Sequence, residues 1–274
     1  MSKLPSMKHD AFFRKYPVFT GKELSQHLSS HGEVGPRAQE SLLFYYRKVG
    51  RVLRVKRGLY AVIPPGADAH TYPIDPFLVA AKLTPDAVLS HHTALEFYGK
   101  AYSVQTHFIY SASRPHSPFT FRAYNFRGTK FSQALLRKGS EHVGVSTSER
   151  AGLEIRVTSL ERTLVDVLDR PYLSGSWEEI WRSLESVEFF DLDKVAEYAF
   201  LLGNGTTAAK VGFFLEQHRD PLMVENQHLK ALHDIQPRQP HYLDRSKREP
   251  GRLVPEWNLV VPDEVIERTW GEVL

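Results

Sequence analysis

Residues 36–63 read PRAQESLLFYYRKVGRVLRVKRGLYAVI, and this stretch decides what we expect of the N-terminal part of the chain. Pro36 suits the first position of a helix, because proline has no N–H to leave unpaired there. Gly50 readily takes the left-handed conformation that ends helices. At helical spacing the residues between them separate into two faces. The predicted core stripe is Ala38, Leu42, Tyr45, Tyr46 and Val49. The predicted outer face is Arg37, Glu40, Ser41, Phe44, Arg47 and Lys48.

A two-stranded β-ribbon is expected to follow this helix. Residues 52–55 and 59–63 are β-branched or apolar runs, joined by the turn Lys56-Arg57-Gly58, in which Gly58 supplies a positive φ. Upstream, we expect a first helix within residues 1–17. Thr20 and Glu23 have the spacing of a capping box and predict the start of a shorter helix after it. The order is helix, turn, helix and β-wing, which predicts a winged helix-turn-helix. We expect Phe44 to pack against the wing, as most large apolar side chains are buried.

The charge distribution supports a nucleic-acid partner. Residues 1–63 hold 12 Lys/Arg against four Asp/Glu, a net charge of +8. The whole chain carries only +3, so the remainder carries −5. A basic module joined to an acidic one is typical of a nucleic-acid-binding protein with a second task.

Length and composition predict two domains in a cytoplasmic protein. A chain of 274 residues with 42% hydrophobic residues can bury a substantial core. The Pro/Gly-rich stretch PPGADAHTYPID predicts a linker, with a DNA-binding domain at residues 1–66 and a second domain at residues 67–274. The sequence shows no membrane span, no signal peptide and no Cys, so disulfides and Cys-based metal sites are excluded.

The second domain is expected to be mixed α/β, which makes the whole chain α+β. Strand-like runs between residues 106 and 157 predict a sheet of about four strands or more. Helical periodicity between residues 160 and 218 predicts a helical subdomain that starts at a Ser159 cap. Residues 252–261 return to strand character, and we expect them to rejoin that sheet.

The predicted DNA contacts fall into three groups. In a winged helix the second helix presents its N-terminal half to base edges in the major groove. Later positions meet phosphates, and the wing tip reaches the backbone or the minor groove. The candidates for base edges are Arg37, Gln39 and Ser41. The candidates for phosphates are Arg47, Lys48 and Arg51, and those at the wing tip are Lys56 and Arg57.

Three candidate chemical sites are discounted, so no catalytic residue, metal or cofactor is expected. Adjacent His91 and His92 diverge by about 100° on a helix, and we expect one packed and one solvated. Glu161, Asp166 and Asp169 suggest a carboxylate cluster, but Glu161 and Asp166 differ by five positions and do not face one site. Glu161-Arg162 and Asp166-Arg170 read as surface or interdomain ion pairs. Glu154-Ile155-Arg156 resembles a nuclease motif, but it has Arg where Lys is usual and no acidic residue to complete it.

Several segments together resemble the AbiEi-type antitoxins of type IV toxin–antitoxin systems. They span both halves of the chain in order: RGLYAV in the wing, DPFLVAAKL, LSHHTALEFYG, VTSLERTLVDVLDRP, KVGFFLEQH and EWNLVVP. The resemblance implies that the N-terminal domain binds operator DNA, with inverted repeats in its own promoter, and represses its own operon. It also implies that the C-terminal domain counteracts a nucleotidyltransferase-like toxin without forming a stable complex.

Two alternatives remain open from the residues alone. One is a metal-dependent DNA-processing enzyme that a winged helix directs to its target. The other is a ligand-sensing regulator, which requires a pocket in the C-terminal domain.

Overall fold

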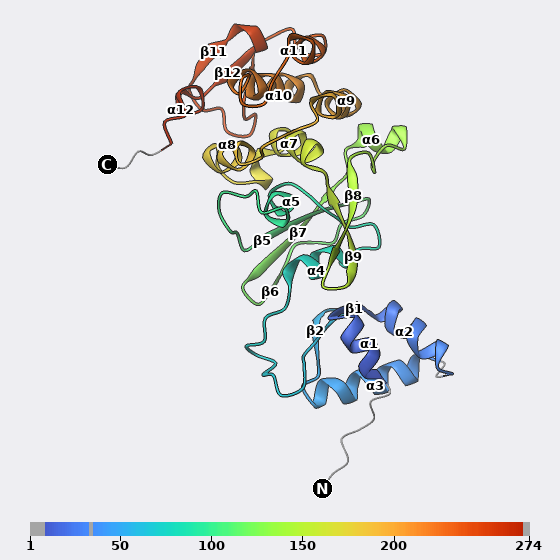
Figure 1. The fold of residues 1–274 in the computed structure, drawn as a ribbon. Coiled ribbons are helices and arrows are strands. Elements are labelled where there is room, and N and C mark those ends of the chain that lie inside the picture. Colours follow the sequence, from blue (N-terminus) through green and yellow to red (C-terminus); the bar gives the residue numbers. More distant parts are fainter. Residues whose placement is uncertain (1–8, 33–34, 271–274) are drawn as a thin grey trace.

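The chain has a mixed α+β fold, described here from a computed structural model (Figure 1). The structure describes residues 9–32 and 35–270. These residues form twelve α-helices and three sheets. The α+β class predicted from the sequence is confirmed. Within these ranges no helix combines the length and apolarity that a membrane crossing requires.

The N-terminal unit, residues 9–63, has three helices and a three-stranded sheet of order β1-β3-β2. Its elements are α1 (Asp10–Lys15), β1 (Val18–Thr20), α2 (Gly21–Ser30), α3 (Pro36–Lys48), β2 (Val52–Lys56) and β3 (Leu59–Val62). The capping box at α2 is confirmed: Thr20 and Glu23 hydrogen-bond each other's backbone N–H. The helix start at Pro36 is confirmed too. The first helix was expected within residues 1–17, and its residues 1–8 lie outside the described part.

The predicted core stripe of α3 is partly wrong. Tyr46 is buried, and Leu42 and Tyr45 pack half-buried against the same core. The other fully buried residue, Leu43, was not predicted, and Val49 is 48% exposed. The stripe is centred on Leu43 and Tyr46, which lie three residues apart and so share one face of the helix. Val49 lies beyond the last helical turn, where the chain bends at Gly50 with a φ of 72°.

Both faces of the N-terminal sheet are buried, which decides how the two halves of the chain meet. Successive residues of a strand point to opposite faces of the sheet. Phe19, Val52 and Val62 belong to the core beneath the helices. Residues on the opposite face of the sheet belong to the core of the following unit, together with residues such as Phe77 and Leu78. The residues on this second face are Val18, Val55, Leu59, Ala61 and Ile63.

The central unit is a six-stranded mixed sheet of order β6-β7-β5-β4-β9-β8, consistent with the predicted four or more strands. Its strands are β4 (Val88–Leu89), β5 (His107–Ala112), β6 (Phe119–Phe121), β7 (Tyr124–Lys130), β8 (Val145–Arg150) and β9 (Leu153–Thr158). Its helices are α4 (Pro76–Ala81), α5 (His92–Phe97) and α6 (Gln133–Lys138). The order places β4, β5 and β9 inside the sheet, where their apolar residues are buried.

A helical layer with its own core covers the far end of the central unit (Figure 1). It comprises α7 (Leu160–Asp169), α8 (Trp177–Glu185), α9 (Leu192–Leu202), α10 (Gly205–Gln217) and α11 (Asn226–His233). The first four helices lie within the predicted helical subdomain, and α11 was not predicted. A small sheet of order β10-β12-β11 and helix α12 (Asp263–Glu267) follow. Its strands are β10 (His241–Tyr242), β11 (Arg252–Val254) and β12 (Leu259–Val261). The expectation that residues 252–261 rejoin the earlier sheet is therefore wrong: they pair with each other and with β10.

The connection between the first two units is fastened to the central sheet. Arg122, in the β6–β7 turn, donates to the carbonyl oxygens of Ala69 and Tyr72. The Lys82 ammonium pairs with the Glu23 carboxylate across the junction, and its Nζ lies 5.4 Å from the centroid of the Tyr16 ring. Glu23 thus caps α2 and also holds the N-terminal unit against α4.

We predict that Ile63→Ala lowers the free energy of unfolding by about 2–5 kcal/mol, the range for truncating a fully buried large aliphatic side chain. Ile63 is 0% exposed and faces the core of the central unit. Urea denaturation followed by circular dichroism measures the change. Val104→Ala is the control, because Val104 is 88% exposed. Equal stability of the two variants would contradict the shared core.

Candidate nucleic-acid interface

The outer face of α3 is an exposed basic surface of the N-terminal unit. The six residues predicted for this face are all exposed, including Phe44 at 70%. The expectation that Phe44 packs against the wing is therefore wrong. In Figure 1 α3 lies on the side of the N-terminal unit away from the central sheet. Among the described residues, no side-chain hydrogen bond or ion pair engages the ends of Arg37, Ser41, Arg47 or Lys48.

Gln39 differs from its predicted role as a base-reading residue. It lies on the half-buried side of α3, where its Nε2 donates to the Gly21 carbonyl oxygen over 2.8 Å. A Cβ at position 21 would lie 3.1 Å from that nitrogen, so glycine permits the close approach of α2 and α3. The amide is used to join the two helices, and we remove Gln39 from the proposed contact set.

Arg51 is also engaged within the N-terminal unit. Its Nε donates to the Ile63 carbonyl oxygen over 3.1 Å, and its guanidinium lies 3.5 Å from the Asp10 carboxylate. These contacts tie the start of β2 to the end of β3 and to α1. The predicted phosphate contact at Arg51 would require breaking them, so we remove it as well.

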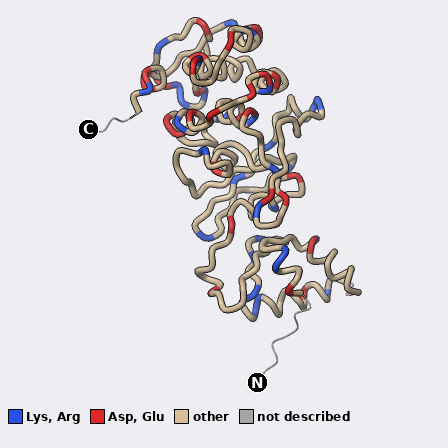
Figure 2. The backbone as a smooth tube through the Cα atoms, viewed as in Figure 1, with Lys and Arg blue, Asp and Glu red and all other residues tan. Residues whose placement is uncertain are grey.

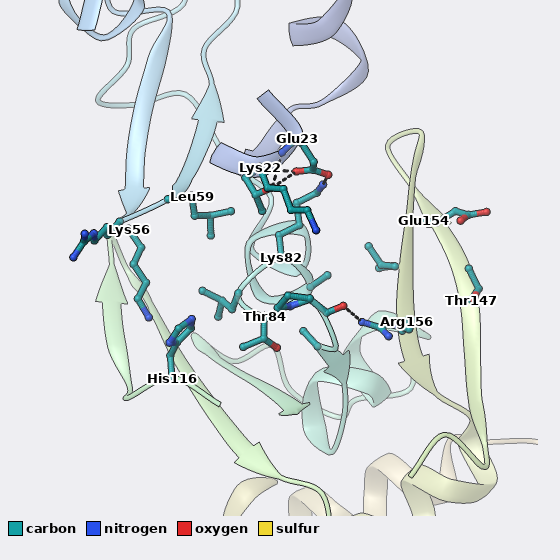
Figure 3. A pocket seen from close by; sticks show the side chains of 18 residues that line it. Lys22, Glu23, Lys56, Leu59, Lys82, Thr84, His116, Thr147, Glu154 and Arg156 are labelled. Atoms are coloured by element: carbon teal, nitrogen blue, oxygen red, sulfur yellow. Dashed lines mark hydrogen bonds and ion pairs between the residues drawn. The ribbon is translucent and has the colours of Figure 1, made fainter. Parts of the chain in front are cut away.

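The wing tip points toward the central unit, which differs from the prediction for Lys56 and Arg57. The Lys56 ammonium lies 4.9 Å from the centroid of the Phe119 ring in β6, and burial lowers the pKa of this amine. In Figure 3 the Lys56 side chain extends toward His116 of the central unit. Arg57 is exposed and lines the same cleft. Lys56 therefore does not share the outward direction of the α3 face, and Arg57 lies at the exposed edge of the cleft.

Arg54 is a basic residue that the sequence analysis did not include among the DNA contacts. It is exposed and pairs across the ribbon with Tyr60, which packs against the core beneath the helices. Strand alternation therefore places Arg54 on the helix side of the sheet, opposite to Val55. The apolar alternation of β2 would have revealed this orientation.

The distribution of charge also separates the units. Figure 2 shows acidic residues clustered over the helical layer and basic residues along α1, α3 and the β-ribbon. Residues 36–63 hold seven Lys/Arg and one acid, Glu40. Such a surface attracts phosphates at long range, and salt screens that attraction.

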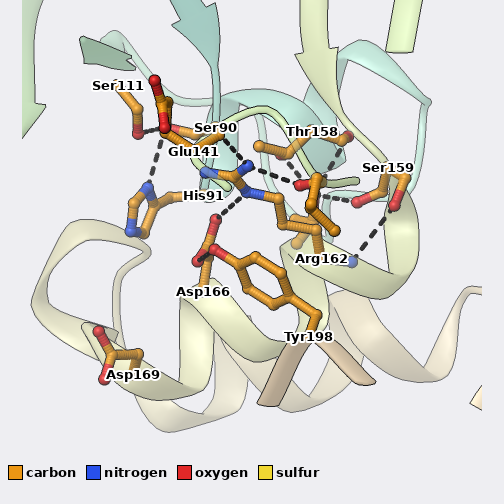
Figure 4. Close-up of polar contacts among 12 residues, drawn as sticks. Ser90, His91, Ser111, Glu141, Thr158, Ser159, Arg162, Asp166, Asp169 and Tyr198 are labelled. Carbon is orange, nitrogen blue, oxygen red and sulfur yellow. Dashed lines mark hydrogen bonds and ion pairs between the residues drawn. The ribbon is translucent and has the colours of Figure 1, made fainter. Parts of the chain in front are cut away.

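A polar cluster, separate from the basic face of α3, is buried between the central sheet and the helical layer (Figure 4). Arg162 is 2% exposed and donates to Asp166 over 3.2 Å and to the Glu141 and Val143 carbonyl oxygens over 2.7 Å. The Tyr198 hydroxyl donates to the other Asp166 oxygen over 2.8 Å, and burial raises the pKa of Tyr198 well above its usual value. The pairing of Asp166 with Arg170, predicted at the surface, is wrong: Arg170 pairs with Asp169 instead.

Both neighbouring histidines are buried, so the expectation of one solvated histidine is wrong. His91 has a φ of 55°, and its Nδ1 lies 3.0 Å from the Ser90 hydroxyl oxygen. Burial, with the nearby Arg170, lowers the pKa of His91 to about 3, so its ring is neutral at pH 7. His92 Nε2 lies 3.0 Å from Glu179 Oε1. The two rings have separate partners, which supports a structural role for each.

Candidate metal ligands do not converge within the described ranges. In these residues no group of three His, Asp or Glu side chains is close enough to hold an ion. The nuclease-like segment lies on β9, where Glu154 is exposed opposite Glu149 and Arg156 donates to the Pro85 carbonyl oxygen.

The whole fold is similar to a known crystal structure, that of the RV2827C protein from Mycobacterium tuberculosis. The TM-score is 0.63, and the match covers 97% of this chain and 94% of that chain at 17% sequence identity. At this identity the similarity shows a shared fold alone. No protein-family model matches the chain, and no curated protein matches it.

We predict that Asp166→Ala destabilises the protein by about 3–5 kcal/mol, because it leaves the buried Arg162 guanidinium without its counter-ion. The control is Glu178→Ala, which breaks an i,i+4 pair with Arg182 on α8 whose side chains are 36–37% exposed. That change should cost below about 1 kcal/mol. Thermal unfolding of both variants measures the difference. A cost for Asp166→Ala as small as the control's would show that the cluster is not structural.

Proposed function

We propose that the N-terminal unit is a winged helix-turn-helix that binds DNA through α3, and that the protein is an autorepressor and antitoxin of a type IV toxin–antitoxin system. The observation that carries the DNA-binding part is the outer face of α3, which is basic and exposed and faces away from the rest of the molecule.

The arrangement of the N-terminal unit supports a winged helix. Helices α1, α2 and α3 precede a β-ribbon, and a third short strand, β1, completes the sheet. In such units the second helix of the helix-turn-helix enters the major groove. Here that helix is α3, with Arg37 and Ser41 near its N-terminus for base edges and Arg47 and Lys48 near its end for phosphates. Arg54 on the ribbon adds a further candidate phosphate contact.

The antitoxin part of the proposal rests on the resemblance of the chain's segments to AbiEi-type antitoxins. These segments extend through the central unit and the helical layer, so we assign the antitoxin activity to residues 67–274. The functional counterpart is a nucleotidyltransferase-like toxin, and we expect no stable complex with it. The acidic charge of this part of the chain, −5 beyond residue 63, also makes it a poor DNA-binding surface.

The metal-dependent enzyme alternative gains no support from the geometry of the described residues, because their candidate ligands do not converge. We propose a non-enzymatic protein because the resemblance to antitoxins implies one. The ligand-sensing alternative does gain some support, because the structure contains a cleft between the first two units that could hold a ligand.

We predict that Arg47→Ala/Lys48→Ala weakens binding to the protein's own promoter. Two phosphate contacts are lost, so the slope of log K against log salt should decrease by about 2. Gel-shift or fluorescence-anisotropy titrations at several salt concentrations, with random DNA as competitor, measure this slope.

The matched control for that test is Arg137→Ala/Lys230→Ala. It removes the same charge from exposed positions on α6 and α11. This variant should bind the promoter with the wild-type salt slope. If both double variants behave alike, net charge determines binding and α3 is not the DNA-contacting helix.

The antitoxin assignment has its own test, which is rescue of growth in cells producing the toxin encoded beside this protein. We predict that Arg47→Ala/Lys48→Ala rescues growth as well as wild type does when both are made from an unrelated promoter, because α3 lies outside residues 67–274. Rescue by neither protein would contradict the antitoxin proposal and leave the DNA-binding proposal intact.

A further inference from the structure

A cleft of about 520 Å³ opens between the N-terminal unit and the central unit (Figure 3). One wall is the wing tip and the start of α2, including Lys22, Lys56 and Arg57. The other consists of the segment after α4 and the strands β8 and β9, including Thr147 and Arg156. The volume falls within the roughly 300–1,000 Å³ of small-molecule sites in proteins. Such sites commonly lie between domains, as this one does.

The side chains that line the cleft carry more positive than negative charge. Its lining holds five Lys/Arg against two acids, Glu23 and Glu154. Glu23 is already paired with Lys82. Among the described residues no carboxylate pairs with Lys22, Lys56 or Arg57.

Lys56 shows why this imbalance favours an anion. Partial burial lowers the pKa of its amine, and its neighbour is the Phe119 ring, whose centroid lies 4.9 Å from Nζ, instead of a carboxylate. A desolvated cation gains more from an anionic partner than a solvated one does. In Figure 3 Lys56 points into the space shared with His116, while Arg156 lies across the cleft.

The floor of the cleft is apolar. Leu59 and Ile155 contribute side chains that are otherwise part of the shared core, and Leu83 and Ala87 complete it. A ligand for this site would therefore combine an anionic group, held at the cationic rim, with a less polar body that covers the floor. A free inorganic ion would leave the floor uncovered.

We propose that the cleft binds a small phosphate-bearing molecule of nucleotide size, with its phosphates held by Lys22, Lys56 and Arg57. The site is separate from the α3 face, which points away from the central unit. A ligand here touches both units, so it stabilises their present arrangement by a free energy that grows with the logarithm of its concentration over its dissociation constant.

The test is isothermal titration calorimetry of the full chain with ATP, GTP, pyrophosphate and adenosine as separate probes. At least one phosphate-bearing probe should bind saturably, and adenosine should bind at least about tenfold more weakly, since a charge-assisted hydrogen bond contributes about 1.5–3 kcal/mol. Lys22→Gln/Lys56→Gln should weaken that binding by about tenfold or more for the same reason.

A steric variant tests the location independently of charge. Thr147 is exposed on β8 and lines the cleft, so Thr147→Trp should block the ligand while suiting a strand, and Thr147→Ala should bind as wild type does. Arg47→Gln/Lys48→Gln, the charge-matched control on α3, should also bind as wild type does. Circular dichroism and melting temperature establish that each variant is folded.

Three results would overturn the proposal. One is the absence of binding by all three phosphate-bearing probes. Another is wild-type affinity in both Lys22→Gln/Lys56→Gln and Thr147→Trp. The third is an equal loss of affinity in the α3 control, which would show a diffuse charge effect without a defined site.

Discussion

The burial of the N-terminal sheet on both faces is the constraint on which the rest of the structure depends. A three-stranded sheet with one apolar face would support an independent unit joined by a free linker. In this chain Val18, Ala61 and Ile63 are nearly or fully buried against the central unit, while Phe19 and Val62 fill the core beneath the helices. Because burial of apolar surface is the main stabilising term in folding, separating the units would be costly.

This constraint determines which surfaces are available for recognition. The sheet face and the wing tip are directed at the central unit, so α3 is left as the outward basic element. The same arrangement encloses the cleft that holds Lys56 and Arg57. The packing of the N-terminal sheet against the central unit therefore divides the basic residues into two sets. The outward set on α3 is proposed to bind DNA, and the set that lines the cleft is proposed to bind a small anion.

Local signals predicted the elements well because each has a local physical cause. The capping box at Thr20 and Glu23, proline at 36 and glycine at 50 and 58 all act within a few residues of themselves. The outer face of α3 followed from helical periodicity for the same reason. The class of the fold and the presence of a central sheet could be predicted in the same way.

Long-range packing accounts for what the sequence could not reveal. The amide of Gln39 reads as a base contact until α2 is known to lie against it, and Arg51 reads as a phosphate contact until Asp10 and the Ile63 carbonyl are beside it. The sequences of β2 and β3 place apolar residues on both faces of the sheet. A wing with two apolar faces can be interpreted only when the central unit that covers one face is known. The burial of His91 and His92 has the same origin.

Hydrogen–deuterium exchange of the full chain, with and without its own promoter DNA, shows which element of the N-terminal unit contacts DNA. Bound DNA should slow exchange in residues 36–48 and leave exchange in the wing turn at residues 56–58 unchanged. Protection of the wing turn with no change in α3 would contradict the assignment of α3 as the DNA-contacting helix, because the wing would then have to leave the central unit to meet the DNA.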